Sequence, residues 1–198
     1  MKLKNSKTYL NLAKAYTAEC SARTRYEFVE YGARYNGQNA LASIIDKVAF
    51  QEFNHARMLY TKLQSASNEE ISNINIDTSL PFKEKWDLLD NIKLLAEDEA
   101  DEARAYAKFI KTAQEEGFDD VATLFEQIRS VELNHKKLFE WLHKELSSGT
   151  LYKKDGENRW VCSSCGHVVT GKEAPDECPL CKAKQGYYEI VLPKNIVL

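Results

Sequence analysis

Long hydrophobic runs and basic stripes are both missing from this 198-residue sequence. No stretch approaches the roughly 18 consecutive apolar residues that a membrane-spanning helix needs, so we expect no membrane partner. The first nine residues are polar and lack the apolar core of a signal peptide, which leads us to expect a cytoplasmic protein. The formal net charge is −3, and with no basic stripe we expect no nucleic-acid partner.

Cysteine is scarce along most of the chain and concentrated near its C-terminus. Four of the five cysteines form two C-x-x-C pairs, Cys162/Cys165 and Cys178/Cys181, and Cys20 stands alone. Without an export signal, such pairs indicate a metal site rather than disulfides. Four thiolates suit zinc or iron, and the spacing alone does not separate a zinc ribbon from an iron centre. We expect Cys20 to be a small buried apolar side chain.

Helical periodicity fills most of residues 1–147. Apolar residues recur at intervals of three and four in four segments, which are 6–36, 38–65, 81–116 and 119–146. Gly37 and Gly117 are expected to end the first and third of these helices. The apolar side of the third segment includes Trp86. Residues 66–81 are rich in Asn and Ser, and they are too long for a hairpin but suit a crossover along a bundle.

The character of the chain changes after residue 147. Residues 151–198 are rich in Gly, Pro, Lys, Tyr and Val, with short β-like runs. So short a segment cannot build an ordinary core and needs a metal to hold it together. We therefore predict a helical domain at 1–147, a linker at 148–158 and a small four-cysteine metal domain at 159–198.

Acids and histidines fall on the apolar sides of the four predicted helices. There are seven of them, namely Glu19, Glu52, His55, Glu99, Glu102, Glu132 and His135. A single such acid could be a satisfied core residue, and the whole set could be surface acids on amphipathic helices. Burying an unpaired Glu is costly, however, and seven on four helices favour inward-facing metal ligands. The neighbouring Asp98 and Asp101 are expected to be solvated.

The register of these residues supports one shared site. In an antiparallel hairpin, residues at one level lie symmetrically about the turn. Three pairs do so: Glu19 with His55 about Gly37, and Glu99 with His135 and Glu102 with Glu132 about Gly117. One Glu from each of two helices and Glu-x-x-His from each of the others is the ligand set of ferritin-like dimetal proteins. The predicted fold is therefore mainly α, a ferritin-like four-helix bundle with a long crossover between helices 2 and 3, and the mixed ligands suit iron or manganese.

With both halves considered, the chain resembles the rubrerythrin family over nearly its whole length. The motifs that carry the resemblance are Glu19 followed by Ala22-Arg23 and Tyr26, Glu52-x-x-His55, Glu99-x-x-Glu102, Glu132-x-x-His135, Cys162-x-x-Cys165-Gly166 and Cys178-Pro179-x-Cys181. The resemblance implies a ferritin-like bundle that holds two iron ions. It also implies a small C-terminal rubredoxin-like β/loop domain that holds one redox-active iron, for which zinc could substitute.

The resemblance further implies different roles for the ligands. Glu52 and Glu132 would bridge the two irons, and Glu19 would be a terminal ligand on the first iron. Glu102 and His55 would alternate on this first iron as its oxidation state changes.

Glu99 and His135 would complete the second iron, and Tyr26 and Tyr106 match the aromatic residues that the family has near the site. The residues expected to take a direct part in the reaction are Glu52, His55, Glu102 and Tyr26.

The activity implied by the resemblance is reduction of hydrogen peroxide to water in oxidative-stress defence. Electrons would pass from a reductase or rubredoxin through the iron of the four cysteines, and the protein would be a homodimer. Two alternatives remain: a ferroxidase or iron-handling protein, and a metal sensor whose cysteines form a structural zinc ribbon. Glu102 favours the peroxidase over the ferroxidase, because redox-linked ligand exchange requires it.

Overall fold

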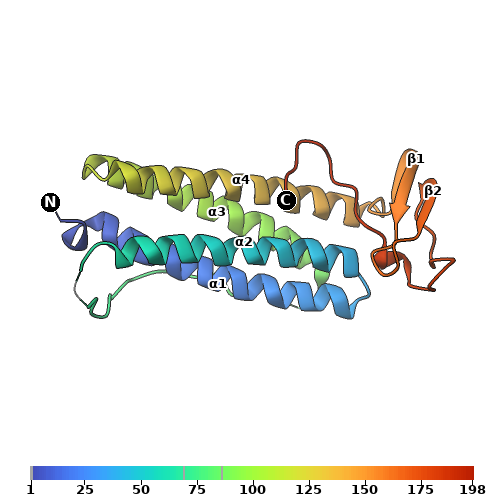
Figure 1. The fold of residues 1–198 in the computed structure, drawn as a ribbon, viewed down its shortest axis with the longest axis horizontal. Helices are drawn as coiled ribbons and strands as arrows, with labels where there is room; N and C mark the ends of the chain where they lie inside the picture. The colour runs from blue at the N-terminus through green and yellow to red at the C-terminus, as the bar shows by residue number, and fades with distance from the viewer. Residues whose placement is uncertain (1, 69, 86) are drawn as a thin grey trace.

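Four long helices form an antiparallel bundle in the computed structural model, which describes residues 2–68, 70–85 and 87–198 (Figure 1). The helices are α1 Lys7–Tyr35, α2 Asn39–Gln64, α3 Leu88–Glu115 and α4 Asp119–Ser147. α1 packs along α2, α3 packs along α4, and the two hairpins meet side by side. The predicted ferritin-like four-helix bundle is therefore confirmed. In the described ranges, no helix is long and apolar enough to cross a membrane.

Both hairpin turns are built on a glycine in the left-handed region. Gly37 has φ +74° and Gly117 has φ +78°, a conformation that side chains with a Cβ adopt at a cost. After the first turn, the N–H of Gln38 donates to the carbonyl of Ala33 at 2.9 Å, and Phe118 repeats this bond to Ala113 at 2.9 Å. These bonds satisfy the last carbonyls of each helix and end it where the sequence predicted.

The connection between α2 and α3 runs the length of the bundle, as predicted, so that α3 begins at the opposite end of the bundle from the end of α2 (Figure 1). α3 begins at Leu88, so the expectation of a helix from about Pro81 was wrong. Asp87 caps the helix by accepting from the N–H of Asp90 at 2.8 Å. Before this cap, the side chain of Asn91 exchanges hydrogen bonds of 2.9 and 2.7 Å with the backbone of Lys85 and holds it outside the helix. Trp86 lies outside the described residues.

The C-terminal domain is a small β/loop unit at the end of the bundle, beyond the α1–α2 turn (Figure 1). Its strands β1 Lys153–Val161 and β2 Val168–Glu173 pair antiparallel, and a short 3₁₀ turn, η2, follows at Gln185–Tyr187. β1 begins within the stretch 148–158 that was predicted as a linker. From the domain, the last residues turn back along α4, where Asn134 pairs with the backbone of Val197.

The hydrophobic core is divided into two clusters. One cluster lies in the half of the bundle where α1 and α4 begin and α2 and α3 end, and it includes Leu12, Leu59 and Phe125. The other cluster joins the opposite half of the bundle to the C-terminal domain, so that Ile45 and Trp160 belong to one core. Between the two clusters lies a layer of buried acids and histidines.

Candidate metal centres

The buried polar layer gathers six of the seven bundle residues that the sequence singled out. They form two overlapping quartets, Glu19/Glu52/His55/Glu132 and Glu52/Glu99/Glu132/His135. Within each quartet, one ligand atom per residue lies within 4.8 Å of all the others, and every member is buried. Because α1, α2, α3 and α4 each contribute, the site depends on the whole bundle.

Glu52 and Glu132 belong to both quartets, and their geometry explains why. One oxygen of Glu52 lies 3.0 Å from Nδ1 of His55, and the other lies 3.0 Å from Nδ1 of His135. Glu132 repeats this arrangement with the same distances of 3.0 Å. The two imidazole rings face each other with their centroids 6.1 Å apart. The structure thus presents two adjacent positions that share two carboxylates.

Each position is completed by one further acid, Glu19 on α1 or Glu99 on α3. A tyrosine on the opposite one of these two helices donates a hydrogen bond to that acid. Oε2 of Glu19 lies 3.4 Å from Nδ1 of His55, and Tyr106 on α3 donates its hydroxyl proton to Glu19 on α1. In the reciprocal arrangement, Tyr26 on α1 donates to Glu99 on α3 at 2.6 Å. These two hydroxyls orient the terminal carboxylates toward the shared ones.

The carboxylates are not satisfied by the protein alone. Four buried oxygens, one each on Glu19, Glu52, Glu99 and Glu132, have no hydrogen bond of acceptable geometry among the described residues. Buried polar atoms nearly always have a partner, and bound cations would supply one here. A set of carboxylates and two imidazoles without thiolates suits iron.

The charges of the layer point the same way. Burial, together with the negative charges of Glu132 and Glu52, raises the pKa of Glu19 well above its ordinary value. Burial also raises the pKa of Glu99 to about 8, against the opposing charge of His135. Burial acts on Glu52 too, but hydrogen bonds from His135 and His55 outweigh it and lower the pKa of this acid. So dense a set of acids needs protons or cations to remain buried.

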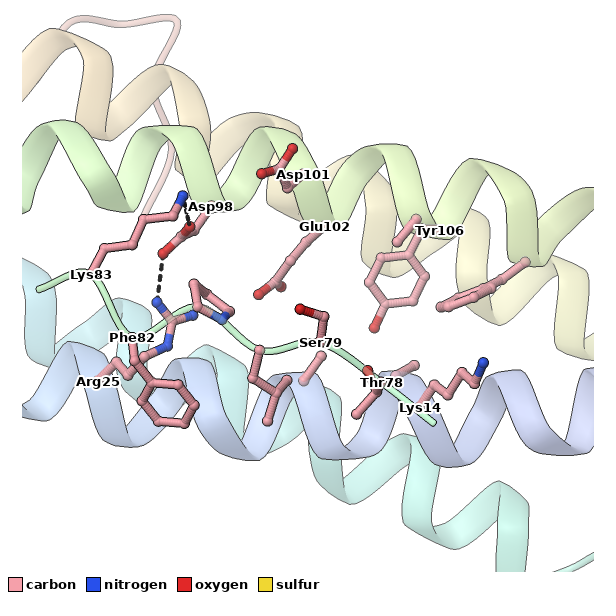
Figure 2. Close-up of a pocket in the computed structure, with 16 residues that line it drawn as sticks. Lys14, Arg25, Thr78, Ser79, Phe82, Lys83, Asp98, Asp101, Glu102 and Tyr106 are labelled. Carbon is pink, nitrogen blue, oxygen red and sulfur yellow. Dashed lines mark hydrogen bonds and ion pairs between the residues drawn. The ribbon is translucent and has the colours of Figure 1, made fainter. Parts of the chain in front are cut away.

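Glu102 is the one predicted bundle ligand that lies outside both quartets. Its side chain projects from α3 into a cavity of about 530 Å³ between α1, α3 and residues 78–83 of the crossover (Figure 2). Tyr106, the partner of Glu19, lines the same cavity. Burial, followed by the charges of Glu19 and Glu99, raises the pKa of Glu102 well above its ordinary value. The setting of Glu102, beside the Glu19 position, thus favours the protonated form of its carboxyl group.

Asp98 was expected to be solvated, and this expectation was wrong. Its side chain is only 2% exposed and accepts from Nη1 of Arg25 at 2.5 Å (Figure 2). Arg25 also pairs with Glu84 of the crossover, so one guanidinium ties α1 to α3 and to the segment that covers the cavity. Asp101 is exposed, as expected. Cys20 is half-buried rather than fully buried.

The four C-terminal cysteines also meet. Sγ of Cys162 lies 3.7 Å from Sγ of Cys181, and Cys165 and Cys178 are separated by the same distance. This separation is too long for a disulfide bond and suits thiolates around one ion. Backbone N–H groups, first that of Cys181, lower the pKa of Cys178 to about 6. Cys162 and Cys178 are buried, whereas Cys165 and Cys181 face solvent. We call this group the four-cysteine site.

Comparison with known proteins follows this division. The Rubrerythrin family model matches residues 11–150, and the model of the rubrerythrin rubredoxin-like domain matches residues 160–189. The chain belongs to the rubrerythrin family. It is 38% identical to the rubrerythrin of Clostridium perfringens over 95% of this chain and 96% of that one. It is 33% identical to the rubrerythrin of Porphyromonas gingivalis over 94% of this chain and 91% of that one.

Solved structures share the fold at lower identity. A mixed-valence nigerythrin structure superposes with a TM-score of 0.61 at 22% identity and covers 93% of this chain and 86% of its own. The bacterioferritin of Desulfovibrio desulfuricans gives a TM-score of 0.63 at 22% identity, covering 72% of this chain and 81% of its own. The bundle quartets and the four-cysteine site fit the iron cofactors of rubrerythrins, namely two iron ions in the bundle and one between the thiolates.

One residue at the bundle site carries no sequence signal that we recognised. Oε1 of Gln51 lies 2.7 Å from Nε2 of His135, on the side of the ring away from the shared carboxylates. Gln51 is half-buried, and only the fold shows that its side chain reaches from α2 to α4.

Proposed function

We propose that this rubrerythrin reduces hydrogen peroxide to water, with electrons relayed from the iron of the four-cysteine site to the iron pair of the bundle. The balance is one peroxide, two protons and two electrons to two waters. The observation that carries the proposal is the presence in one chain of a two-ion carboxylate site and a one-ion thiolate site. When loaded with ferrous iron, the bundle site supplies two electrons together, and the thiolate iron returns them singly.

Glu102 and the cavity it lines supply a place for the substrate beside the iron pair. Burial and the neighbouring acids raise the pKa of Glu102 and so favour its protonated form, from which it would donate a proton to an oxygen of peroxide as the O–O bond breaks. We further propose that Glu102 and His55 alternate at the Glu19 position. Tyr26 holds Glu99 in place and is a second hydroxyl donor near the site.

We propose a homodimer in which the thiolate iron of one chain serves the iron pair of its partner. The C-terminal domain contacts the turn at Gly37, and Glu19 lies 18 residues before this turn. At the rise of an α-helix this separation is about 27 Å, a long path for an electron within one chain. Exposed aromatic side chains on α1 and α2, including Phe28, Tyr35 and Phe50, offer an apolar surface to a second copy.

The electron donor would be a reductase or a rubredoxin. Cys165 and Cys181 face solvent and present the four-cysteine site to such a partner. In this role the protein would protect the cytoplasm against peroxide.

The test is stopped-flow oxidation of the anaerobically reduced, iron-loaded protein. Mixing with hydrogen peroxide should oxidise the bundle irons much faster than mixing with air-saturated buffer. Faster oxidation by oxygen would refute the peroxidase and support a ferroxidase or iron-handling protein. The visible spectrum of the oxidised protein tests the four-cysteine site in the same experiment: ferric thiolate iron is red, whereas a zinc ribbon is colourless.

A further inference from the structure

The two histidines of the bundle site have matching inner contacts but different outer ones. Nδ1 of each ring lies 3.0 Å from one oxygen of Glu52 and 3.0 Å from one oxygen of Glu132. Nε2 of His135 has a partner, Oε1 of Gln51 at 2.7 Å. Among the described residues, none makes a hydrogen bond to Nε2 of His55. The two rings therefore make the same contacts through Nδ1 with the shared carboxylates but different contacts through Nε2 with the rest of the protein.

The Gln51 contact fixes the chemistry of the His135 ring. An amide oxygen only accepts hydrogen bonds, so Nε2 of His135 must carry the proton. When a metal ion is bound among Glu52, Glu99 and Glu132, Nδ1 is then free of its proton and offers its lone pair to the ion. The bond also anchors the ring, because rotation about either side-chain torsion would break it.

The place of Gln51 in the fold makes this anchor rigid. Gln51 precedes the bridging residue Glu52 on α2, whereas His135 lies on α4, so the bond crosses the bundle. The same turn of α2 thus supplies one shared carboxylate and the group that orients the opposite imidazole. His55 lies on α2 itself and belongs to the quartet of Glu19. Glu102 and the cavity lie beside that quartet.

We propose that Gln51 is a positioning residue that holds the His135 ring in place and locks it as the Nε2–H tautomer at the Glu99/His135 position. In the part of the chain that the structure describes, His55 has no such anchor. The inference extends the proposed function, since it concerns the same site, but its test involves no peroxide and can fail independently of it.

The first measurement compares the unmutated protein with two variants of Gln51. In zinc-loaded protein labelled with ¹⁵N-histidine, the Nε2 proton of His135 should give a correlation peak that exchanges slowly with water. Nε2 of His55 should exchange much faster. In Gln51→Leu the slow peak should be lost, and in Gln51→Glu, which keeps an acceptor oxygen, it should persist. A His135 Nε2 proton that exchanges rapidly in the unmutated protein would overturn the proposal.

The second measurement is the stepwise zinc affinity of the bundle site. Gln51→Leu should weaken one of the two positions by about 10–100-fold, the usual effect of losing a partner to a metal-bound histidine, and Gln51→Glu should restore it. Gln114→Leu, the same change on an exposed part of α3, serves as the control and should leave both positions unchanged. Affinities in Gln51→Leu that equal those of the unmutated protein would overturn the proposal.

Discussion

The backbone of Gly186 lies directly against the carbonyl group of Gly37, where the C-terminal domain meets the α1–α2 turn. A Cβ at position 186 would stand 2.0 Å from the carbonyl oxygen of Gly37 and 3.0 Å from its carbon. Beside this contact, the hydroxyl of Tyr152 donates to the side chain of Gln38 at 3.1 Å. The orientation of the four-cysteine site on the bundle therefore depends on the absence of one side chain.

Gly186→Ala should displace the C-terminal domain from the bundle. No flexible side chain is available to yield, because both contacting atoms belong to the backbone, and we expect a loss of about 1–3 kcal/mol in stability, typical of overpacking. Thermal unfolding should show this loss, and limited proteolysis should cut the connector after Ser147 faster. Gly156→Ala is the matched control, since nothing lies within 4 Å of its would-be Cβ. Equal behaviour of the two variants would contradict the contact.

Arg25→Leu should destabilise the bundle strongly. Asp98 is 2% exposed and would keep only the half-exposed Lys83, at 3.6 Å, as a partner, and Glu84 would lose its link to α1. Removing one partner of a buried ion pair costs about 3–5 kcal/mol. Urea unfolding of the metal-loaded protein measures this loss.

Arg23→Leu, two residues earlier, is the control for that experiment. Arg23 pairs with Glu27 on the exposed side of α1, where such pairs contribute about 0–1 kcal/mol. Similar losses in the two arginine variants would show that Asp98 is not held by Arg25.

The bundle and most of its buried layer could be predicted because both depend on residues that recur at regular intervals in the sequence. Apolar intervals of three and four place the ligand residues on inner faces, and symmetry about Gly37 and Gly117 places them at one height. The structure brings six of the seven within ligand distance. The burial of Asp98 was not predicted, because its partner Arg25 lies on another helix. No pattern within α3 shows that a positive charge from α1 compensates the charge of this aspartate.

Single long-range contacts account for the other differences. The start of α3 at Leu88 depends on a cap by Asp87 and on the bonds between Asn91 and Lys85, which outweigh the helical tendency of the preceding residues. The reach of Gln51 to His135 likewise depends on one pair of atoms. Such contacts have no period, so only the folded chain reveals them.

Glu102→Ala should leave the metals bound and slow peroxide turnover. Glu102 lies outside both quartets, so its loss removes no member of either, but it removes the proposed proton donor from the cavity. General acids contribute about 100-fold or more to a rate, and steady-state turnover with a reductase should fall by that order. Asp101→Ala changes an exposed acid on the same cavity wall and should retain turnover. Loss of both bundle irons from Glu102→Ala would instead make Glu102 a structural ligand.

Glu116 gives the stability of the bundle a dependence on pH that is separate from the metal site. Its carboxylate accepts from the N–H groups of Lys7 at 3.0 Å and Thr8 at 2.8 Å, and from the Thr8 hydroxyl at 2.6 Å. The end of α3 thus caps the start of α1. Slight burial opposes the charge, but the hydrogen bonds from Thr8 and Lys7 outweigh it and lower the pKa of Glu116.

A carboxylate whose pKa is lower in the folded state stabilises the fold above its unfolded pKa of about 4.3. This contribution is lost as the pH falls through the folded value. Glu116→Gln resembles the protonated side chain, so it should cost about 1 kcal/mol at pH 7, the usual contribution of a cap, and progressively less below about pH 4. Denaturant unfolding across pH 3–7 measures the difference, with the exposed neighbour Glu115→Gln as control. A cost for Glu116→Gln that stays constant with pH would show that the charge of Glu116 does not stabilise α1.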